Sequence, residues 1–215
     1  MAKVLIAIPC MDSVPAQFAH SLATLTKVGE CVVAMQCGSL VYTSRENLAA
    51  EAIKQGADYV MWFDSDMMFA PNTLARLMDD IKEQGEGVIM TGVYYRRVTP
   101  FSPVAYESLE IDDQNRATWV EVKHVPDDLF EVAGCGFGCV LAPTEAFVDV
   151  MSKYGTMFNP IGGTGEDLAF CWRARQCGWR FVADPRIPLG HVGHHIITSE
   201  YYQDYNELTK DNGNG

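Results

Sequence analysis

The chain has 215 residues, 48% of them hydrophobic, and a formal net charge of −12. This length fits one large domain or two small ones, and the apolar content is sufficient for a core that needs no disulfide bonds. The negative charge disfavours a broad nucleic-acid-binding surface, because such a surface normally presents a basic face to the phosphates. We therefore expect a globular protein with an acidic, self-repelling surface.

The cysteine content indicates a reducing compartment. Seven cysteines are present and no two are spaced as a C-x-x-C pair, so we expect neither a disulfide framework nor a zinc ribbon. Reduced, mostly buried thiols are typical of cytoplasmic proteins, and we predict that location. The apolar run at residues 4–9 is too short for a signal-peptide core, and no run of about 18 apolar residues predicts a membrane span.

Strand and helix patterns alternate through the first half of the chain. Apolar runs predict strands at residues 4–9, 31–36, 58–63 and 87–95, and the continuous run at 4–9 has the pattern of a strand buried on both faces. Helical spacing of apolar residues predicts helices between them, at about residues 18–25, 43–56 and 74–85. Thr43 and Glu46 form a T-x-x-E pattern, which predicts a capping box. The alternation indicates a mostly parallel sheet with helices on both faces.

The second half of the chain predicts a mixed architecture. We expect strands at residues 119–125, 131–142 and 179–184, with helices at about 147–154 and 168–176. The stretch I-G-G-T-G-E-D at 161–167 predicts a flexible loop. The final stretch T-K-D-N-G-N-G has no apolar residue. We therefore predict an α/β fold in one domain at residues 1–205, with a mostly parallel central sheet, a mixed second half and a disordered tail at 206–215.

Two aspartates mark the first candidate site. The stretch V-M-W-F-D-S-D-M-M-F-A-P places Asp64 and Asp66 at the carboxyl end of a strand that we expect to be buried. Ligands of open α/β sheets bind beyond this end, and residues two apart on an extended segment point to the same side. Both carboxylates can therefore approach one magnesium or manganese ion that binds a diphosphate. The alternative is a turn in which one aspartate caps the next helix.

Two later segments carry polar side chains suited to the same chemistry. Glu166 and Asp167 open a helix behind the glycine-rich G-G-T-G loop, which lets backbone approach a ligand and could close as a lid. Ordinary acidity at a helix start is about equally consistent with this pair. Histidines 191, 194 and 195 follow the last strand, and such a cluster could supply the ligand that the two aspartates lack.

Two other motifs are less specific. Arg96 and Arg97 follow a central strand, where they could meet a phosphate or an acceptor or lie in a solvated loop. The glycines of A-G-C-G-F-G-C, residues 133–139, could let backbone approach an acceptor. The two cysteines of this motif lack the second pair that a zinc site needs.

These residues together give the chain a resemblance to the GT-A-fold glycosyltransferases, close to the large family 2-like group. Four features match in order: a first strand ending I-P-C-M-D, the S-R-E-N-L helix start, the D-S-D-M box and the E-D-x-x-x-x-x-R helix. The trailing G-H-V-G resembles the segment with the C-terminal metal-binding histidine of many GT-A enzymes. The match covers about residues 3–195, and the order and spacing of the motifs are more specific than any one of them.

The resemblance implies a metal-dependent transfer of a sugar from a nucleotide-diphosphate sugar to an acceptor hydroxyl. It places Pro9 and Asp12 in the nucleotide pocket. Arg45 would meet the nucleotide or the diphosphate, and Asp64, with Ser65 beside it, would face the donor.

The resemblance also implies the metal ligands and the catalytic group. The implied ligands of the divalent cation, manganese or else magnesium, are Asp66, Asp64 and His191, with His194 as the alternative to His191. Asp167 would be the base that deprotonates the acceptor hydroxyl in an inverting transfer, with Glu166 beside it binding the acceptor.

Other classes stay open at this point. Retaining GT-A enzymes share the D-x-D box and need no such base. A nucleotidyltransferase would usually carry a glycine-rich basic first loop, which C-M-D-S-V-P-A-Q is not. A haloacid-dehalogenase-type phosphohydrolase has its D-x-D after the first strand rather than the third. A non-catalytic nucleotide-sugar-binding module would not need the Glu-Asp pair. The sequence identifies neither sugar nor acceptor, and its charge disfavours a nucleic-acid acceptor.

Overall fold

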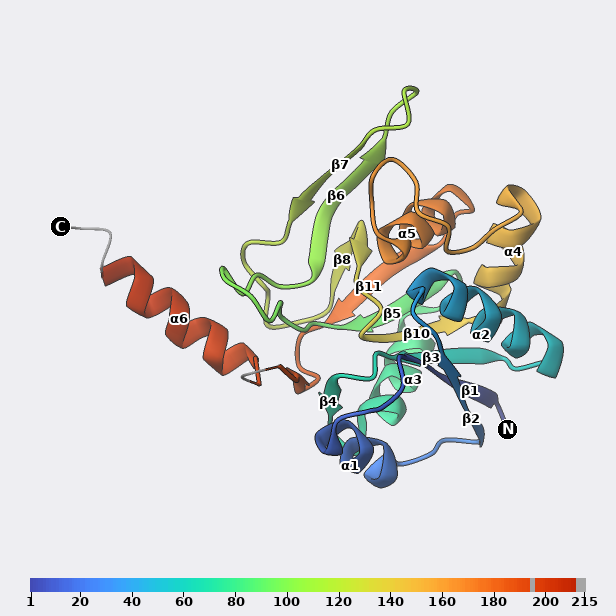
Figure 1. Ribbon diagram of the computed structural model, residues 1–215, viewed down its shortest axis with the longest axis horizontal. Coiled ribbons are helices and arrows are strands. Elements are labelled where there is room, and N and C mark those ends of the chain that lie inside the picture. The colour runs from blue at the N-terminus through green and yellow to red at the C-terminus, as the bar shows by residue number, and fades with distance from the viewer. Residues whose placement is uncertain (194–195, 212–215) are drawn as a thin grey trace.

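The computed structural model describes residues 1–193 and 196–211, and within them a seven-stranded sheet forms the centre, in the order β2-β1-β3-β10-β5-β11-β8 (Figure 1). Its strands are β1 (Lys3–Cys10), β2 (Glu30–Cys37), β3 (Tyr59–Phe63), β5 (Val88–Gly92), β8 (Phe130–Val132), β10 (Cys139–Pro143) and β11 (Arg180–Asp184). β10 runs antiparallel to both of its neighbours and β8 runs antiparallel to β11, whereas the other pairs are parallel. The predicted α/β class with a mostly parallel sheet is confirmed.

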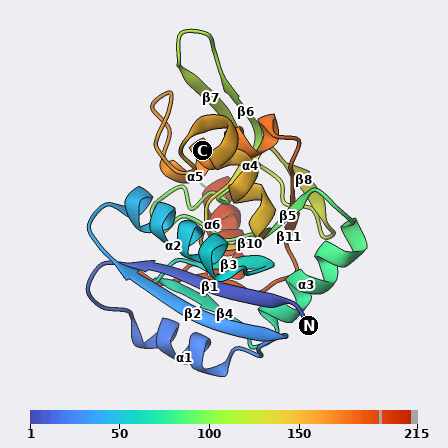
Figure 2. The same cartoon turned by 90° about the vertical axis from the view of Figure 1, so that its right-hand side faces the viewer.

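Helices cover both faces of this sheet (Figures 1 and 2). One face carries α1 (Ala16–Thr24) and α3 (Thr73–Gln84), and the other carries α2 (Val41–Gln55), α4 (Thr144–Tyr154) and α5 (Glu166–Gln176).

Successive residues of β3 show why its sequence is apolar throughout. Trp62 packs against Phe137, Phe147 and Phe158 in the core beneath α2, α4 and α5. Phe63 points to the other face, where its ring stacks on Phe69 at a centroid distance of 3.8 Å. Because alternate side chains enter different cores, every position of the strand is buried or nearly so.

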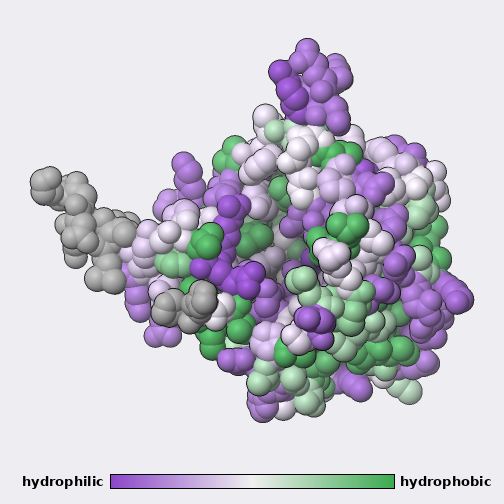
Figure 3. Space-filling model, in the orientation of Figure 1, coloured by the Kyte–Doolittle hydropathy of each residue, from purple (hydrophilic) through white to green (hydrophobic). Residues whose placement is uncertain are grey.

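Smaller elements surround the central sheet. The strands β6 (Ala105–Ile111), β7 (Ala117–Glu121) and β9 (Gly134–Cys135) form a three-stranded sheet, and β4 (Met67–Phe69) pairs with β12 (Leu189–His191). The exposed turn of the β6–β7 hairpin, residues 112–116, is the hydrophilic tip at the top of Figure 3. Helix α6 (Ser199–Asp211) projects from the body in Figure 1, and Tyr202 at its base stacks on Tyr95.

The structure also differs from the predicted elements. The strand expected at 131–142 is three short strands, and the one expected at 87–95 ends at Gly92. The predicted strand at 119–125 ends at Glu121, and its partner β6 was not singled out. Of the tail expected at 206–215, residues 206–211 belong to α6, and 212–215 lie outside the described residues.

The seven cysteines are free thiols, and no described helix is long and apolar enough to cross a membrane.

The predicted capping box at Thr43 and Glu46 is wrong. Helix α2 begins at Val41, before Thr43, and no side chain caps it at Leu40. The Glu46 carboxylate instead accepts hydrogen bonds from the backbone N–H groups of Met157 (3.0 Å) and Phe158 (2.8 Å). The Glu46 carboxylate, which the local pattern assigned to the start of α2, therefore binds a loop distant in the sequence. These hydrogen bonds join α2 to the segment between α4 and α5.

We predict that Glu46→Ala lowers the free energy of unfolding by about 1.5–3 kcal/mol, because two backbone donors lose a charged acceptor. Glu51→Ala is the matched control on the same helix, since the polar contacts of Glu51 within the described residues are those with the nearby Gln55 and Lys54. Urea unfolding of both variants measures the difference. Equal losses would show that the loop does not depend on Glu46.

Candidate functional site

A cavity of about 390 Å³ lies at the carboxyl ends of the parallel strands. Its lining includes nine of the residues singled out in the sequence: Pro9, Arg45, Asp64, Ser65, Asp66, Arg97, Glu166, Asp167 and His191. Asp12 lies just beyond the lining residues 9–11 and is exposed, and His194 lies outside the described residues. Segments from both ends of the chain therefore meet where open α/β sheets bind their ligands.

A larger hollow of about 790 Å³ lies at the opposite end of the parallel strands, near their amino ends. Tyr59 and Val88 line it where β3 and β5 begin, and Trp179 lines it just before β11. We place the site in the smaller cavity, because ligands of open α/β sheets bind at the carboxyl ends of the strands and not at their amino ends.

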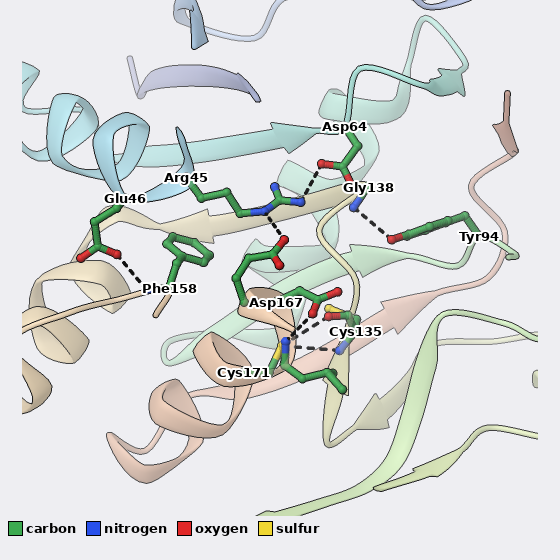
Figure 4. Close-up of polar contacts among 11 residues, drawn as sticks. Arg45, Glu46, Asp64, Tyr94, Cys135, Gly138, Phe158, Asp167 and Cys171 are labelled. Carbon is green, nitrogen blue, oxygen red and sulfur yellow. Dashed lines mark hydrogen bonds and ion pairs between the residues drawn. The ribbon is translucent and has the colours of Figure 1, made fainter. Parts of the chain in front are cut away.

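Arg45 stands at the centre of the site and is only 3% exposed. Its Nη2 lies 2.7 Å from Asp64 Oδ1, and its Nε lies 3.1 Å from Glu166 Oε1. The guanidinium also packs over the rings of Trp62 and Phe137. Figure 4 shows it reaching from α2 toward the end of β3 and the start of α5. Burial alone would lower the pKa of Arg45, but the charges of Asp64 and Glu166 raise it above its ordinary value.

One donor of this buried guanidinium, Nη1, has no hydrogen-bond partner in the described part of the chain. Buried donors are normally paired, and Arg45 lines the cavity. An anionic ligand entering the cavity would be a suitable acceptor for it.

The glycines of the A-G-C-G-F-G-C motif position Asp64. The backbone N–H of Asp64 donates to the carbonyl of Gly138 (3.3 Å), and the N–H of Gly138 donates to the hydroxyl of Tyr94 (3.3 Å; Figure 4). A Cβ at Gly138 would lie 2.8 Å from the Tyr94 ring, and one at Gly136 would lie 2.1 Å from its hydroxyl. These glycines therefore make room for a buried tyrosine, where the sequence suggested an approach of backbone to an acceptor.

Asp66 and His191 face each other across the β4–β12 pair. Asp66 Oδ2 lies 3.6 Å from His191 Nε2 and 3.0 Å from Arg97 Nη1. His191 Nδ1 donates to the carbonyl oxygen of Tyr95 at 2.8 Å, because a carbonyl can only accept, and this contact orients Nε2 toward Asp66. Burial alone would raise the pKa of Asp66, but His191 and Arg97 lower it below its ordinary value.

The donor set around Asp66 fits a divalent cation only in part. Among the residues whose side chains are described, no three His, Cys, Asp or Glu groups come together as a metal site. Asp66 and His191 offer an oxygen and an oriented imidazole nitrogen, and metal-binding histidines usually donate their other N–H to a carbonyl in this way. Asp64 is held by Arg45, so its part in metal binding stays a prediction.

Asp167 is a half-buried carboxyl beside Glu166 at the start of α5. Burial and the neighbouring charge of Glu166 raise its pKa to about 6. Its Oδ1 accepts the backbone N–H of Leu168 at 2.8 Å. Such a group changes its protonation state close to neutral pH, as a general base requires.

Some groups that shape the site could not be recognised from the sequence. The carbonyl of Tyr95 and the hydroxyl of Tyr94 come from the segment after β5, where the sequence predicts only the continuation of a buried strand. Arg97 was considered as a phosphate or acceptor contact, but its pairing with Asp66 depends on a loop whose path the sequence does not indicate.

Comparison with known proteins supports the fold. No protein-family model and no curated protein matches the sequence. The crystal structure of A197 from STIV matches with a TM-score of 0.63 and 18% identity, over 92% of this chain and 94% of that one. The structure of GalNAc-T7 with UDP, GalNAc and Mn²⁺ matches with a TM-score of 0.60 and 12% identity, over 96% of this chain and 48% of that one. The chain therefore has the GT-A fold of glycosyltransferases, and likenesses at these identities show the fold alone.

We predict that Arg45→Ala lowers the free energy of unfolding by about 3 kcal/mol, because it leaves the Asp64 and Glu166 carboxylates without their buried partner. Arg116→Ala is the matched control, since Arg116 forms an exposed pair with Asp112 on the hairpin and should cost less than about 1 kcal/mol. Urea unfolding gives both values. A similar small loss for both variants would contradict the central role of Arg45.

Proposed function

We propose that the protein is a metal-dependent glycosyltransferase that moves a sugar from a nucleotide-diphosphate sugar to an acceptor hydroxyl. The observation that carries this proposal is the gathering of the D-x-D box, the Glu-Asp pair and His191 in one cavity of a GT-A fold. The likeness to GalNAc-T7, which was crystallised with UDP and Mn²⁺, supports the same class of donor.

Asp66 and His191 are the proposed protein ligands of the cation. Their donor types suit manganese, and magnesium is the alternative. A bound divalent cation would neutralise the charge that develops on the leaving diphosphate. Arg97 now pairs with the same Asp66 oxygen and would be free to meet a phosphate once Asp66 has another partner. The unpaired Nη1 of Arg45 is the second proposed contact to the donor.

Asp167 is the proposed base. Because Oδ1 accepts the N–H of Leu168, we assign proton acceptance to Oδ2. The acceptor hydroxyl would lose its proton to Oδ2 as its oxygen attacks the anomeric carbon, and the nucleotide diphosphate would leave from the opposite face. Glu166 is held by Arg45 and is proposed to position the acceptor.

We expect Asp66→Ala and His191→Ala each to weaken manganese-dependent UDP binding by at least about tenfold, since even outer-shell partners of metal sites are worth this much. His124→Ala, on an exposed loop away from the cavity, is the matched control. Calorimetric titration with UDP, with and without MnCl₂, measures the effect. Unchanged binding by His191→Ala would remove residue 191 from the metal site.

Activity should fall as the pH drops below about 6, because the base must be ionised and the pKa of Asp167 is raised to about 6.

Asp167→Asn should lower turnover by about 100-fold or more with UDP binding nearly unchanged. Release of UDP from a panel of UDP-sugars, with water or simple sugars as acceptors, measures both effects. Asp113→Asn on the exposed hairpin turn is the control.

The same assays separate the competing functions. Retained anomeric configuration by NMR would remove the need for a base and leave Asp167 as a positioning residue. Pyrophosphate release from a nucleoside triphosphate would indicate a nucleotidyltransferase. UDP binding without turnover of any sugar in the panel would favour a non-catalytic binding module.

A further inference from the structure

We propose that Cys10 and Cys37 form a peroxide-sensitive dithiol site that closes to a reversible disulfide beside the cavity. Their sulfur atoms lie 3.5 Å apart. The two residues end β1 and β2 and are direct partners in the parallel register of these strands. The proposal concerns thiols to which the transferase chemistry assigns no role.

The backbone around this pair is compatible with a disulfide. Adjacent strands lie about 4.8 Å apart, which falls within the Cα separations of about 4.4–6.8 Å found in disulfides. β2 is an edge strand of the sheet, so its end can move toward β1 without disturbing a second neighbour. A small shift of two strand ends is therefore sufficient for bond formation.

The two thiols differ in a way that suits stepwise oxidation. Cys37 is exposed, whereas Cys10 is only 7% exposed and lines the cavity. Burial, together with the Cys37 side chain, raises the pKa of Cys10 to about 11, so its thiolate is scarce at neutral pH. An oxidant should therefore react first at Cys37, with Cys10 as the resolving thiol.

The chemistry balances with hydrogen peroxide as the oxidant. The Cys37 thiolate attacks one peroxide oxygen, which gives a sulfenic acid and, with one proton, water. Cys10 then attacks the Cys37 sulfur, a second water leaves, and the disulfide forms. In sum, two thiols and one peroxide give one disulfide and two waters. A dithiol such as dithiothreitol reverses the step by thiol–disulfide exchange and is itself oxidised.

A second close pair explains the expected selectivity. Cys135 and Cys171 also lie together, with the Cys171 thiol 3.5 Å from the carbonyl oxygen of Cys135, but both are at most 1% exposed. Peroxide in solution reaches exposed thiols first, so under native conditions the strand-end pair should react and the core pair should not.

Closure of the disulfide would change the cavity wall. Pro9 and Cys10 at the end of β1 and Met11 after it form part of the wall, and Gly38 and Ser39 follow β2 into it. Cross-linking the two strand ends would draw these segments together, and we infer that a nucleotide diphosphate then binds less tightly. This consequence rests on the proposed function, whereas formation of the bond does not.

The test uses the full chain under native conditions. Wild-type protein is treated with peroxide, alkylated and digested with trypsin, which places Cys10 on residues 4–27 and Cys37 on residues 28–45. Mass spectrometry should find these two peptides cross-linked, and dithiothreitol should release them. Cys37→Ser should abolish the cross-link. Cys31→Ser is the matched control, because Cys31 shares the second peptide but pairs with Val4 at the other end of the strand.

Every outcome decides the proposal. A cross-link that survives Cys37→Ser, or that is lost in Cys31→Ser, would overturn it. So would oxidation of Cys37 to a sulfinic acid, or a bond between two chains, in place of the link to Cys10.

A second measurement separates this inference from the proposed function. Titration of reduced and oxidised protein with UDP and MnCl₂ should show about tenfold weaker binding after oxidation. Peroxide-treated Cys37→Ser should bind as the untreated variant does. Equal affinity of both wild-type forms would overturn the effect on the cavity. If reduced protein binds no UDP, the proposed donor is wrong, while the cross-link still decides the dithiol site.

Discussion

The arrangement of the site depends on one buried cation. Arg45 joins the end of β3 to the start of α5 through Asp64 and Glu166, although 121 residues separate it from Glu166. A guanidinium can do this because its fork presents several donors in fixed directions and stays charged when buried. Without it, Asp64, Glu166 and Asp167 would form an uncompensated group of carboxylates. The same contact therefore holds the fold together and allows the acidic residues to share one cavity.

The charge of Asp66 is balanced in a different way, by a partner that is partly exposed to solvent. Its carboxylate contacts Arg97, which is half exposed, and faces a histidine whose orientation is fixed by a backbone carbonyl. An exposed arginine pair contributes little stability, so its partner can be exchanged at low cost. Arg45 and Arg97 thus have different parts in one cavity. The buried cation fixes the framework, and under the proposed function a divalent cation would replace the exposed one, which would then turn toward a phosphate.

The sequence predicted those features that depend on local pattern. Continuous apolar runs identified β1, β3 and β5 because strands covered on both faces need apolar residues throughout. The same pattern identified β2, although β2 is an edge strand with no fully buried residue. Features that depend on distant partners were not predictable in this way. Glu46 matched a capping box but serves a loop more than a hundred residues away. The glycines of residues 133–139 were interpreted as a place where backbone approaches a ligand. In the structure, the absence of side chains at Gly136 and Gly138 makes room for Tyr94. The D-x-D box was identified because ligands bind at the carboxyl ends of strands in this fold. The pairing of Asp66 with Arg97 was not predicted, because it depends on the path of the loop that carries Arg97.

The Glu166–Asp167 pair shows how one environment can give adjacent carboxylates different properties. Both open the same helix, but Arg45 binds only Glu166 directly. Glu166 therefore has a cation at 3.1 Å to balance its charge. Asp167 is left with burial and a negative neighbour, and its pKa rises to about 6. A raised pKa on one of two neighbouring carboxyl groups is the property that the proposed role of Asp167 in proton transfer would use. If the bond between Arg45 and Glu166 were lost, the negative charge of Glu166 would stand beside Asp167 without its cation, and that charge is one of the two largest causes that raise the pKa of Asp167.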